Sequence, residues 1–241
     1  MAGMSKIVVL HARKGGVGKS TLAYELAWLL QAPLVDLEWD DGCVSRIWGY
    51  RHEERSSSPL LNALEKGTTP RLHHGFHKPD LLPGHPDFAI SQPSEGDMAD
   101  ALLKWAGEWG KEWVVVDSHP GASTSAHGAL SVANVVIAPT TLRTYDLNAT
   151  EGMVKEMVDY PLVLVPNMVP RVPPAAEIAR LRQMVENTPV QVGPPVPLAT
   201  AVGTRKKRVA MTSEDRPAKA VMPAVNAINK LADFVRSYVG E

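Results

Sequence analysis

Eight residues near the start of the chain combine glycines with two lysines and two hydroxyl side chains: Lys14, Gly15, Gly16, Val17, Gly18, Lys19, Ser20 and Thr21. The glycines let the backbone curl so that successive N–H groups face one anion. Lys19 would reach the β- and γ-phosphates of a nucleotide, and the Ser20 hydroxyl would ligate Mg²⁺. These residue types at this spacing predict a site for nucleotide phosphates.

The segments on either side of this loop are those that a phosphate site requires. The apolar run 7–10 before it predicts a buried strand. After it, leucines recur at helical spacing, at Leu22, Leu26, Leu29 and Leu30. A strand, a turn and a helix in this order bring the N–H groups of the loop and the positive end of the helix dipole to one point.

A carboxylate follows another apolar run. Residues 113–116 predict a strand, and Asp117 comes directly after it. An acid at the carboxyl end of such a strand lies beside a phosphate loop and holds Mg²⁺, usually through a water. A buried strand that ends in a turn aspartate is the structural alternative, and the presence of the loop favours the metal role.

Strand and helix patterns alternate along the chain, which predicts an α/β fold with a doubly wound, mostly parallel sheet and helices on both faces. Strands are expected at 7–10, 34–37, 81–82, 113–116, 135–138, 162–165 and 196–198, and helices at 21–30, 59–66, 97–109, 123–132, 145–158, 174–186 and 218–238. The stretch 50–92 is expected to be mostly loop and short helices. With 241 residues and no break in composition, we expect a single domain over 1–241.

Composition narrows the classes of protein that fit. The net charge is −1, so a surface that binds polyanions must be local. The single cysteine, Cys43, excludes a disulfide within the chain and fits a reducing cytoplasm. No apolar run approaches the roughly 20 residues that span a bilayer. The first strand begins within a few residues of the N-terminus, so no signal peptide is expected.

The phosphate loop departs from the common pattern. Arg13 stands where that pattern has glycine, and Lys14 is an additional lysine. In both respects the loop resembles the deviant P-loop of the ParA/MinD family of ATPases. The resemblance extends over nearly the whole chain, more loosely over 50–92, and includes 118–121 as a switch loop that senses the γ-phosphate. It implies that Lys14 reaches across a dimer interface to the nucleotide bound by the partner. The alternative is that Lys14 is a charged side chain of the loop that faces solvent.

The resemblance also assigns roles at the ends of two other strands. Asp36 would support the phosphate loop and the second shell of Mg²⁺, and Glu38 stands where relatives have the aspartate that orients the attacking water. Glutamate is longer by one methylene, so slow hydrolysis is expected. Asp40 or Asp41 would take that role if the loop folds differently. Asn167 would contact adenine, although an asparagine in a turn after a strand is an equal alternative.

The function that the resemblance implies is that of a ParA-like ATPase for plasmid or chromosome partition. Such a protein binds ATP or ADP with Mg²⁺, closes into a homodimer on ATP and binds double-stranded DNA non-specifically. It leaves DNA when a ParB-like partner stimulates hydrolysis. The expected location is the cytoplasm, at the nucleoid. Positioning of a protein assembly instead of DNA stays open.

A basic run marks the candidate DNA-binding surface. It consists of Arg205, Lys206, Lys207 and Arg208, with Arg216 and Lys219 nearby, and residues 200–241 hold eight basic and four acidic residues. Such a local excess suits sequence-independent contacts with phosphates. A solvated surface loop is the alternative.

Two other functions fit the same fold. A MinD-like, membrane-associated regulator requires a basic amphipathic helix at the C-terminus. The last segment is apolar at Val221, Val225, Ile228, Leu231 and Val235 but only weakly basic, so we expect it to pack on the domain and expect no membrane contact. An amidoligase or dethiobiotin-synthetase-like enzyme generally lacks the early lysine, so Lys14 counts against it.

Overall fold

The computed structural model describes residues 5–40, 43–55 and 57–240. Among these residues, seven strands form one sheet in the order β3-β2-β4-β1-β5-β6-β7, and every pair is parallel. The strands are β1 (Lys6–Leu10), β2 (Leu34–Asp36), β3 (Leu81–Leu82), β4 (Trp113–Asp117), β5 (Val135–Thr140), β6 (Leu162–Pro166) and β7 (Gln191–Val192). The predicted α/β fold is confirmed.

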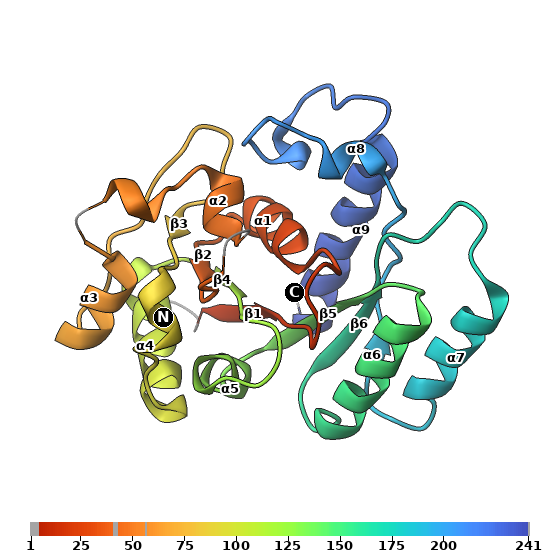
Figure 1. Cartoon of the computed structure of the whole chain (residues 1–241), viewed down its shortest axis with the longest axis horizontal. Helices are drawn as coiled ribbons and strands as arrows, with labels where there is room; N and C mark the ends of the chain where they lie inside the picture. Colours follow the sequence, from red (N-terminus) through yellow and green to blue (C-terminus); the bar gives the residue numbers. More distant parts are fainter. Residues whose placement is uncertain (1–4, 41–42, 56, 241) are drawn as a thin grey trace.

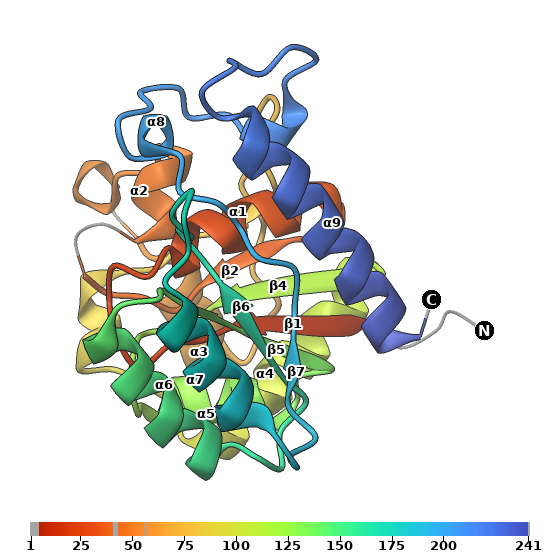
Figure 2. The same ribbon diagram turned by 90° about the vertical axis from the view of Figure 1, so that its right-hand side faces the viewer.

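Helices cover both faces of the sheet (Figures 1 and 2). They are α1 (Lys19–Leu29), α2 (Val44–Trp48), α3 (Pro59–Lys66), α4 (Glu95–Trp109), α5 (Thr124–Ser131), α6 (Thr144–Glu156), α7 (Ala175–Val185), α8 (Thr200–Gly203) and α9 (Met222–Val239). Three short 3₁₀ helices are η1 (His52–Glu54), η2 (Pro86–Ala89) and η3 (Met211–Ser213). Helices α1 and α9 lie on one face, and α4, α5 and α6 lie on the other.

The central strand shows why the sheet has two cores. Ile7 and Val9 face the core beneath α4 and α5, whereas Val8 and Leu10 face the core beneath α1 and α9. All four side chains are fully buried. Successive side chains of a strand point to opposite faces, so a strand covered on both sides needs an unbroken apolar run.

The end of the sheet differs from the prediction in one strand. Residues 196–198 were expected to form a strand, but the last strand is β7 at Gln191–Val192. Pro197 makes only an isolated bridge to Val169. Pro197 has no N–H group to donate to a ladder. The N–H groups of Val196 and Leu198 on either side of it donate to Pro166 and Val169, but the segment forms no strand.

The C-terminal helix packs on the domain, as the sequence predicted. Val225, Ile228, Leu231 and Val235 are buried in the core that α9 shares with α1 and β5. Within the described part of the chain, no helix has the length and apolar character needed to cross a membrane.

Candidate functional site

The phosphate loop connects the central strand β1 to helix α1, which begins at Lys19. Gly16 and Gly18 have φ angles of +80° and +88°, which L side chains rarely adopt. A side chain at Gly18 would also collide with the amide of Asn167. These two positions therefore require glycine, and the loop holds the curled shape that the sequence predicted.

Lys19 follows β1 and contacts carboxylates at the ends of two other strands, β2 and β4. Its Nζ donates to Oδ1 of Asp117 at 2.6 Å and also to Oε1 of Glu38. The side chain is 5% exposed. Burial alone would lower the pKa of Lys19, but the charges of Asp117 and Glu38 outweigh it, and the pKa is raised. Lys19 is thus a firmly charged lysine at the mouth of the loop.

Acidic groups outnumber this lysine. Burial, and then the charge of Asp117, raises the pKa of Asp36 to about 6. Burial raises the pKa of Glu38 to about 7, against the opposing effect of Lys19. The charges of Asp36, Glu38 and Asp117 repel one another, which contributes to the raised pKa values, and a divalent cation would offset this repulsion.

The residues present fit Mg²⁺. Oδ2 of Asp117 is buried and has no hydrogen-bond partner among the described residues, and Ser20 lies at the start of α1 on the same loop. Within the described ranges, no group of three or more His, Cys, Asp or Glu side chains is arranged to hold a metal ion. Magnesium keeps several waters and takes phosphate oxygens as ligands, so its binding here would depend on the nucleotide.

Asp36 organises the loop after β2. Its Oδ1 accepts from the backbone N–H of Glu38 at 3.1 Å. Its Oδ2 accepts from the backbone N–H of Ser45 at 2.9 Å and from the Ser45 hydroxyl. The same hydroxyl accepts from the N–H of Gly84, which ties the 50–92 stretch to the site. Asp36 therefore fixes the backbone that carries Glu38.

Glu38 and Asp40, the two described candidates for orienting the attacking water, differ in burial. Asp40 is exposed, whereas Glu38 is buried and touches Lys19. Asp41 lies outside the described residues. The geometry favours Glu38 over Asp40.

Asn167 lies beside the phosphate loop. Its Nδ2 donates to the carbonyl oxygen of Val17 at 2.7 Å, and the side chain is buried. Next to it opens a mainly apolar cavity of about 240 Å³, whose lining includes Gly18, Leu22, Met168, Pro197 and Ile228. Asn167 thus joins the phosphate loop to the wall of this cavity.

Lys14 points away from the phosphate site. Its Nζ lies 3.6 Å from Oδ1 of Asp146 and 5.5 Å from the ring centre of Tyr145, both at the start of α6. The side chain is 45% exposed. The two lysines of the loop therefore face different surroundings, Lys19 a buried cluster and Lys14 the surface.

Two contacts at the site were not predicted from the sequence. His11 follows β1, and its Nδ1 donates to the hydroxyl of Ser118 at 2.8 Å, while that hydroxyl donates to the carbonyl of Leu10. Burial, and then the charge of Lys19, lowers the pKa of His11 to about 4. His119 stacks on Trp39 with ring centres 3.5 Å apart. Both pairs are distant in sequence, so no local signal identifies them.

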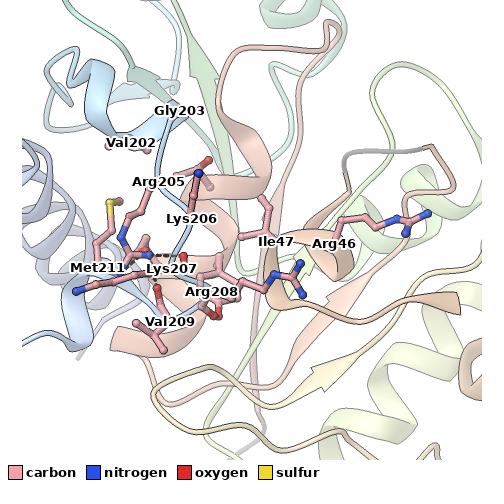
Figure 3. A pocket seen from close by; sticks show the side chains of 13 residues that line it. Arg46, Ile47, Val202, Gly203, Arg205, Lys206, Lys207, Arg208, Val209 and Met211 are labelled. Atoms are coloured by element: carbon pink, nitrogen blue, oxygen red, sulfur yellow. Dashed lines mark hydrogen bonds between the residues drawn. The ribbon is translucent and has the colours of Figure 1, made fainter. Parts of the chain in front are cut away.

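The predicted basic run lies between α8 and η3, against α1 and α2 (Figure 3). We call residues 204–210 the basic loop. It lines an open pocket of about 620 Å³ together with Thr21 and Tyr24 of α1 and Arg46 and Ile47 of α2. Arg216 and Lys219 are exposed between η3 and α9.

The four cations of the run do not form one patch. Arg205 donates to the carbonyl oxygens of Lys207 and Val209 and to Oε1 of Glu214, and Lys207 pairs with the same oxygen at 3.1 Å. Arg208 extends in the opposite direction to Lys207, toward α2 (Figure 3). Arg205 is therefore committed to the structure of the loop itself.

Solved structures share this fold. The cell-division ATPase MinD of Pyrococcus furiosus has a TM-score of 0.76 at 18% identity, over 97% of this chain and 99% of that one. A putative plasmid partition protein of Borrelia burgdorferi B31, solved with AMPPNP, has a TM-score of 0.73 at 16% identity. The match covers 98% of this chain and 100% of that one. A cobyrinic acid a,c-diamide synthase of Mycobacterium smegmatis, solved with an ATP analogue and magnesium, has a TM-score of 0.71 at 20% identity. The match covers 97% of this chain and 95% of that one.

No protein-family model matches the sequence, and no curated protein matches it. The chain has the P-loop fold of the ParA/MinD ATPases, and the resemblance read from the sequence is confirmed at the level of the fold. Proteins with this fold include one named as a synthase as well as one named as an ATPase, so the fold by itself does not decide the function.

Proposed function

We propose that the protein is a ParA-like ATPase that binds ATP with Mg²⁺, dimerises on ATP and binds DNA without sequence preference. The observation that carries this proposal is that the two lysines of the phosphate loop differ in burial and in their contacts. Lys19 is buried among carboxylates where phosphates would enter, and Lys14 is presented at the surface beside it. A lysine on the outside of a phosphate loop is suited to the nucleotide of a second copy of the chain.

The chemistry is transfer of the γ-phosphoryl group to water. The N–H groups of the loop and the ammonium of Lys19 would bind the phosphates and offset the charge that develops in the transition state. Mg²⁺, held through Ser20 and Asp117, supplies further charge stabilisation when bound. Phosphates would compete with Glu38 for Lys19, and a released Glu38 could then accept a hydrogen bond from the attacking water.

The base would occupy the mainly apolar cavity beside Asn167. The cavity begins at Gly18 and runs between residues 196–203 and α9. A purine ring is flat and mainly apolar, which suits such a lining, and the buried amide of Asn167 is a polar group there that is bound to the phosphate loop at Val17.

DNA would contact the basic loop through some of its cations. Lys206 has no ion-pair partner among the described residues, and the Arg208 side chain lies over Gly49 at the end of α2. Lys207, by contrast, is paired with Glu214. Lys206 and Arg208 are therefore the stronger phosphate contacts, with Arg216 and Lys219 as flanking charges.

A salt titration of DNA affinity tests this proposal. The wild-type protein with a slowly hydrolysed ATP analogue should bind a short duplex of arbitrary sequence, and affinity should fall steeply with salt. Each phosphate contact contributes about 0.9 to the slope of log K against log salt. Lys206→Ala should lower that slope by about 1 per protomer bound. Lys207→Ala is the matched control and should change it less.

Three results would count against the proposal. No binding of the duplex with ATP would exclude the partition function. Equal slopes for Lys206→Ala and Lys207→Ala would place the DNA site elsewhere. Binding to anionic vesicles instead of DNA would favour a MinD-like role, which the buried apolar face of α9 argues against.

The partner and the cargo follow from the same proposal. A ParB-like protein would stimulate hydrolysis and release the dimer from DNA, and the cargo would be a plasmid, a chromosome or a protein assembly. Measurement of ATP turnover with and without the product of a neighbouring gene, in the presence of DNA, tests this step. An ATP-dependent ligation of an amine to a carboxylate substrate would instead support the amidoligase function.

A further inference from the structure

The basic loop is attached to the helix that begins at the phosphate loop. Helix α1 starts at Lys19, and Tyr24 and Glu25 lie in its second turn. At 1.5 Å per residue, Glu25 is about 9 Å along the helix axis from Lys19. Both Tyr24 and Glu25 bind the backbone of the segment that carries the basic run.

Tyr24 fixes the loop at Arg208. Its hydroxyl donates to the carbonyl oxygen of Arg208 at 2.7 Å, and the side chain is 2% exposed. Burial raises the pKa of Tyr24, so the hydroxyl keeps its proton and remains a donor. The backbone of one of the two proposed phosphate contacts is therefore held directly by α1.

Glu25 fixes the residues that follow the loop. Its Oε1 accepts from the N–H of Met211 at 2.8 Å, and its Oε2 accepts from the N–H and the hydroxyl of Thr212 at 3.0 and 2.7 Å. These N–H groups belong to the first residues of η3, which have no partner inside a short helix. Glu25 is 2% exposed, and a buried charge is costly unless it is well hydrogen-bonded.

The loop is also braced by contacts within itself and on its other side. The guanidinium of Arg205 spans the carbonyl oxygens of Lys207 and Val209. The N–H of Ala210 donates to the carbonyl of His77, which is the attachment on the other side. A displacement of α1 at Tyr24 and Glu25 would thus shift the cations of the loop together.

Two features connect nucleotide binding to these contacts. Phosphates must take Lys19, the first residue of α1, away from Glu38 and Asp117. In addition, the cavity proposed for the base and the basic pocket share part of their walls, at Thr21, Val202, Gly203 and Met211. The N–H of Met211 is itself one of the groups that bind Glu25.

We infer that Tyr24 and Glu25 are positioning residues through which the phosphate-loop helix sets the position of the basic loop, so that the nucleotide controls the affinity of that loop for a polyanion. The identity of the polyanion as DNA rests on the function proposed above. The contacts themselves, and their response to nucleotide, do not depend on it.

Amide hydrogen exchange of the full chain, with and without Mg²⁺ and a slowly hydrolysed ATP analogue, is the direct test. In the wild type, the nucleotide should change the exchange of residues 204–213. Glu25→Gln keeps the size of the side chain but sets an amide N–H₂ group against one of the η3 donors. Tyr24→Phe removes one oxygen, and Tyr50→Phe is its matched control, since Tyr50 is a buried tyrosine with no hydroxyl hydrogen bond among those described.

In Glu25→Gln and Tyr24→Phe, nucleotide affinity should stay within about twofold of wild type, while the response of residues 204–213 to nucleotide is reduced. DNA affinity in the presence of the analogue should fall roughly fivefold for Tyr24→Phe, the equivalent of one ordinary hydrogen bond. A purely structural role would change exchange equally with and without nucleotide. That result, or an unresponsive wild-type loop, would overturn the inference.

The two proposals fail in different ways. If the wild type binds no DNA but residues 204–213 respond to nucleotide and lose the response in Tyr24→Phe, the coupling stands and the DNA partner is wrong. If DNA binding depends on ATP to the same degree in Tyr24→Phe, Glu25→Gln and Tyr50→Phe, the partner stands and the coupling is wrong. Should Glu25→Gln fail to fold, Tyr24→Phe still decides between these results.

Discussion

Lys14 of the phosphate loop lies 3.6 Å from Asp146 at the start of α6, measured from Nζ to Oδ1. The contact joins the loop that follows β1 to the helix that follows β5. It keeps the ammonium of Lys14 outside the cluster around Lys19. Because the pair is partly exposed, it contributes little to stability and is easily exchanged for another anion.

Lys14→Ala should therefore leave a folded protein that no longer dimerises on ATP and hydrolyses ATP poorly. Size-exclusion chromatography with a slowly hydrolysed analogue measures dimerisation. Lys104→Ala, which changes an exposed lysine of α4, is the control for loss of charge. Normal dimerisation and turnover in Lys14→Ala would exclude a role across the interface.

Glu38→Ala should trap the ATP-bound dimer. The substitution removes the carboxylate that would orient the water and also a competitor of the phosphates for Lys19. Turnover should fall roughly 100-fold, the usual scale for the loss of a general base, while ATP affinity is retained. Single-turnover hydrolysis measures this effect. Asp40→Ala is the comparison, and a loss of turnover there instead of in Glu38→Ala would reassign the role to Asp40.

Asp36→Ala should weaken Mg²⁺–ATP binding and lower the free energy of unfolding. It leaves buried donors of Glu38 and Ser45 without their acceptor, at about 1–3 kcal/mol for each such donor. Ser45→Ala removes only the hydroxyl and should cost less on both measures. Urea titration and nucleotide titration give the two quantities. Unchanged nucleotide affinity in Asp36→Ala would limit Asp36 to a structural role.

Stability should fall in mild acid because of His11. Its pKa is lowered from 6.5 to about 4 in the folded protein. The unfolded chain therefore takes up the proton first, and the contribution of His11, present above pH 6.5, is lost as the pH falls toward 4. The loss is at most about 3 kcal/mol.

Urea unfolding of wild type and His11→Asn at pH 7 and pH 4.5 measures this contribution. Asparagine keeps an N–H donor for Ser118 but does not titrate, so the variant should lose less stability than the wild type between these pH values. Equal losses in the two proteins would show that His11 is not the group responsible. The difference between the proteins is the relevant quantity, because buried carboxylates also titrate over this range.

Local sequence determined the phosphate loop and the parallel sheet. The curled loop needs glycine at positions such as Gly16 and Gly18, and a strand buried on both faces needs an unbroken apolar run, as at 7–10. Both features depend on residues that are neighbours in the chain, so they can be predicted from the sequence alone. The seven expected helices lie within a few residues of the observed ones for the same reason, since their apolar spacing is local. The short helices α2 and α8 were not predicted.

Only the tertiary structure decided how the charged side chains are paired. The sequence placed Asp117 and Glu38 at the same site as Lys19, because parallel strands bring distant carboxyl ends to one edge of the sheet, but it did not show that Lys19 pairs with both. The basic run looks uniform in sequence, yet Arg205 and Lys207 turn to Glu214 and Arg208 turns toward α2. Which cation of the loop finds an acid depends on how the loop folds back toward Glu214 and on the elements packed around it.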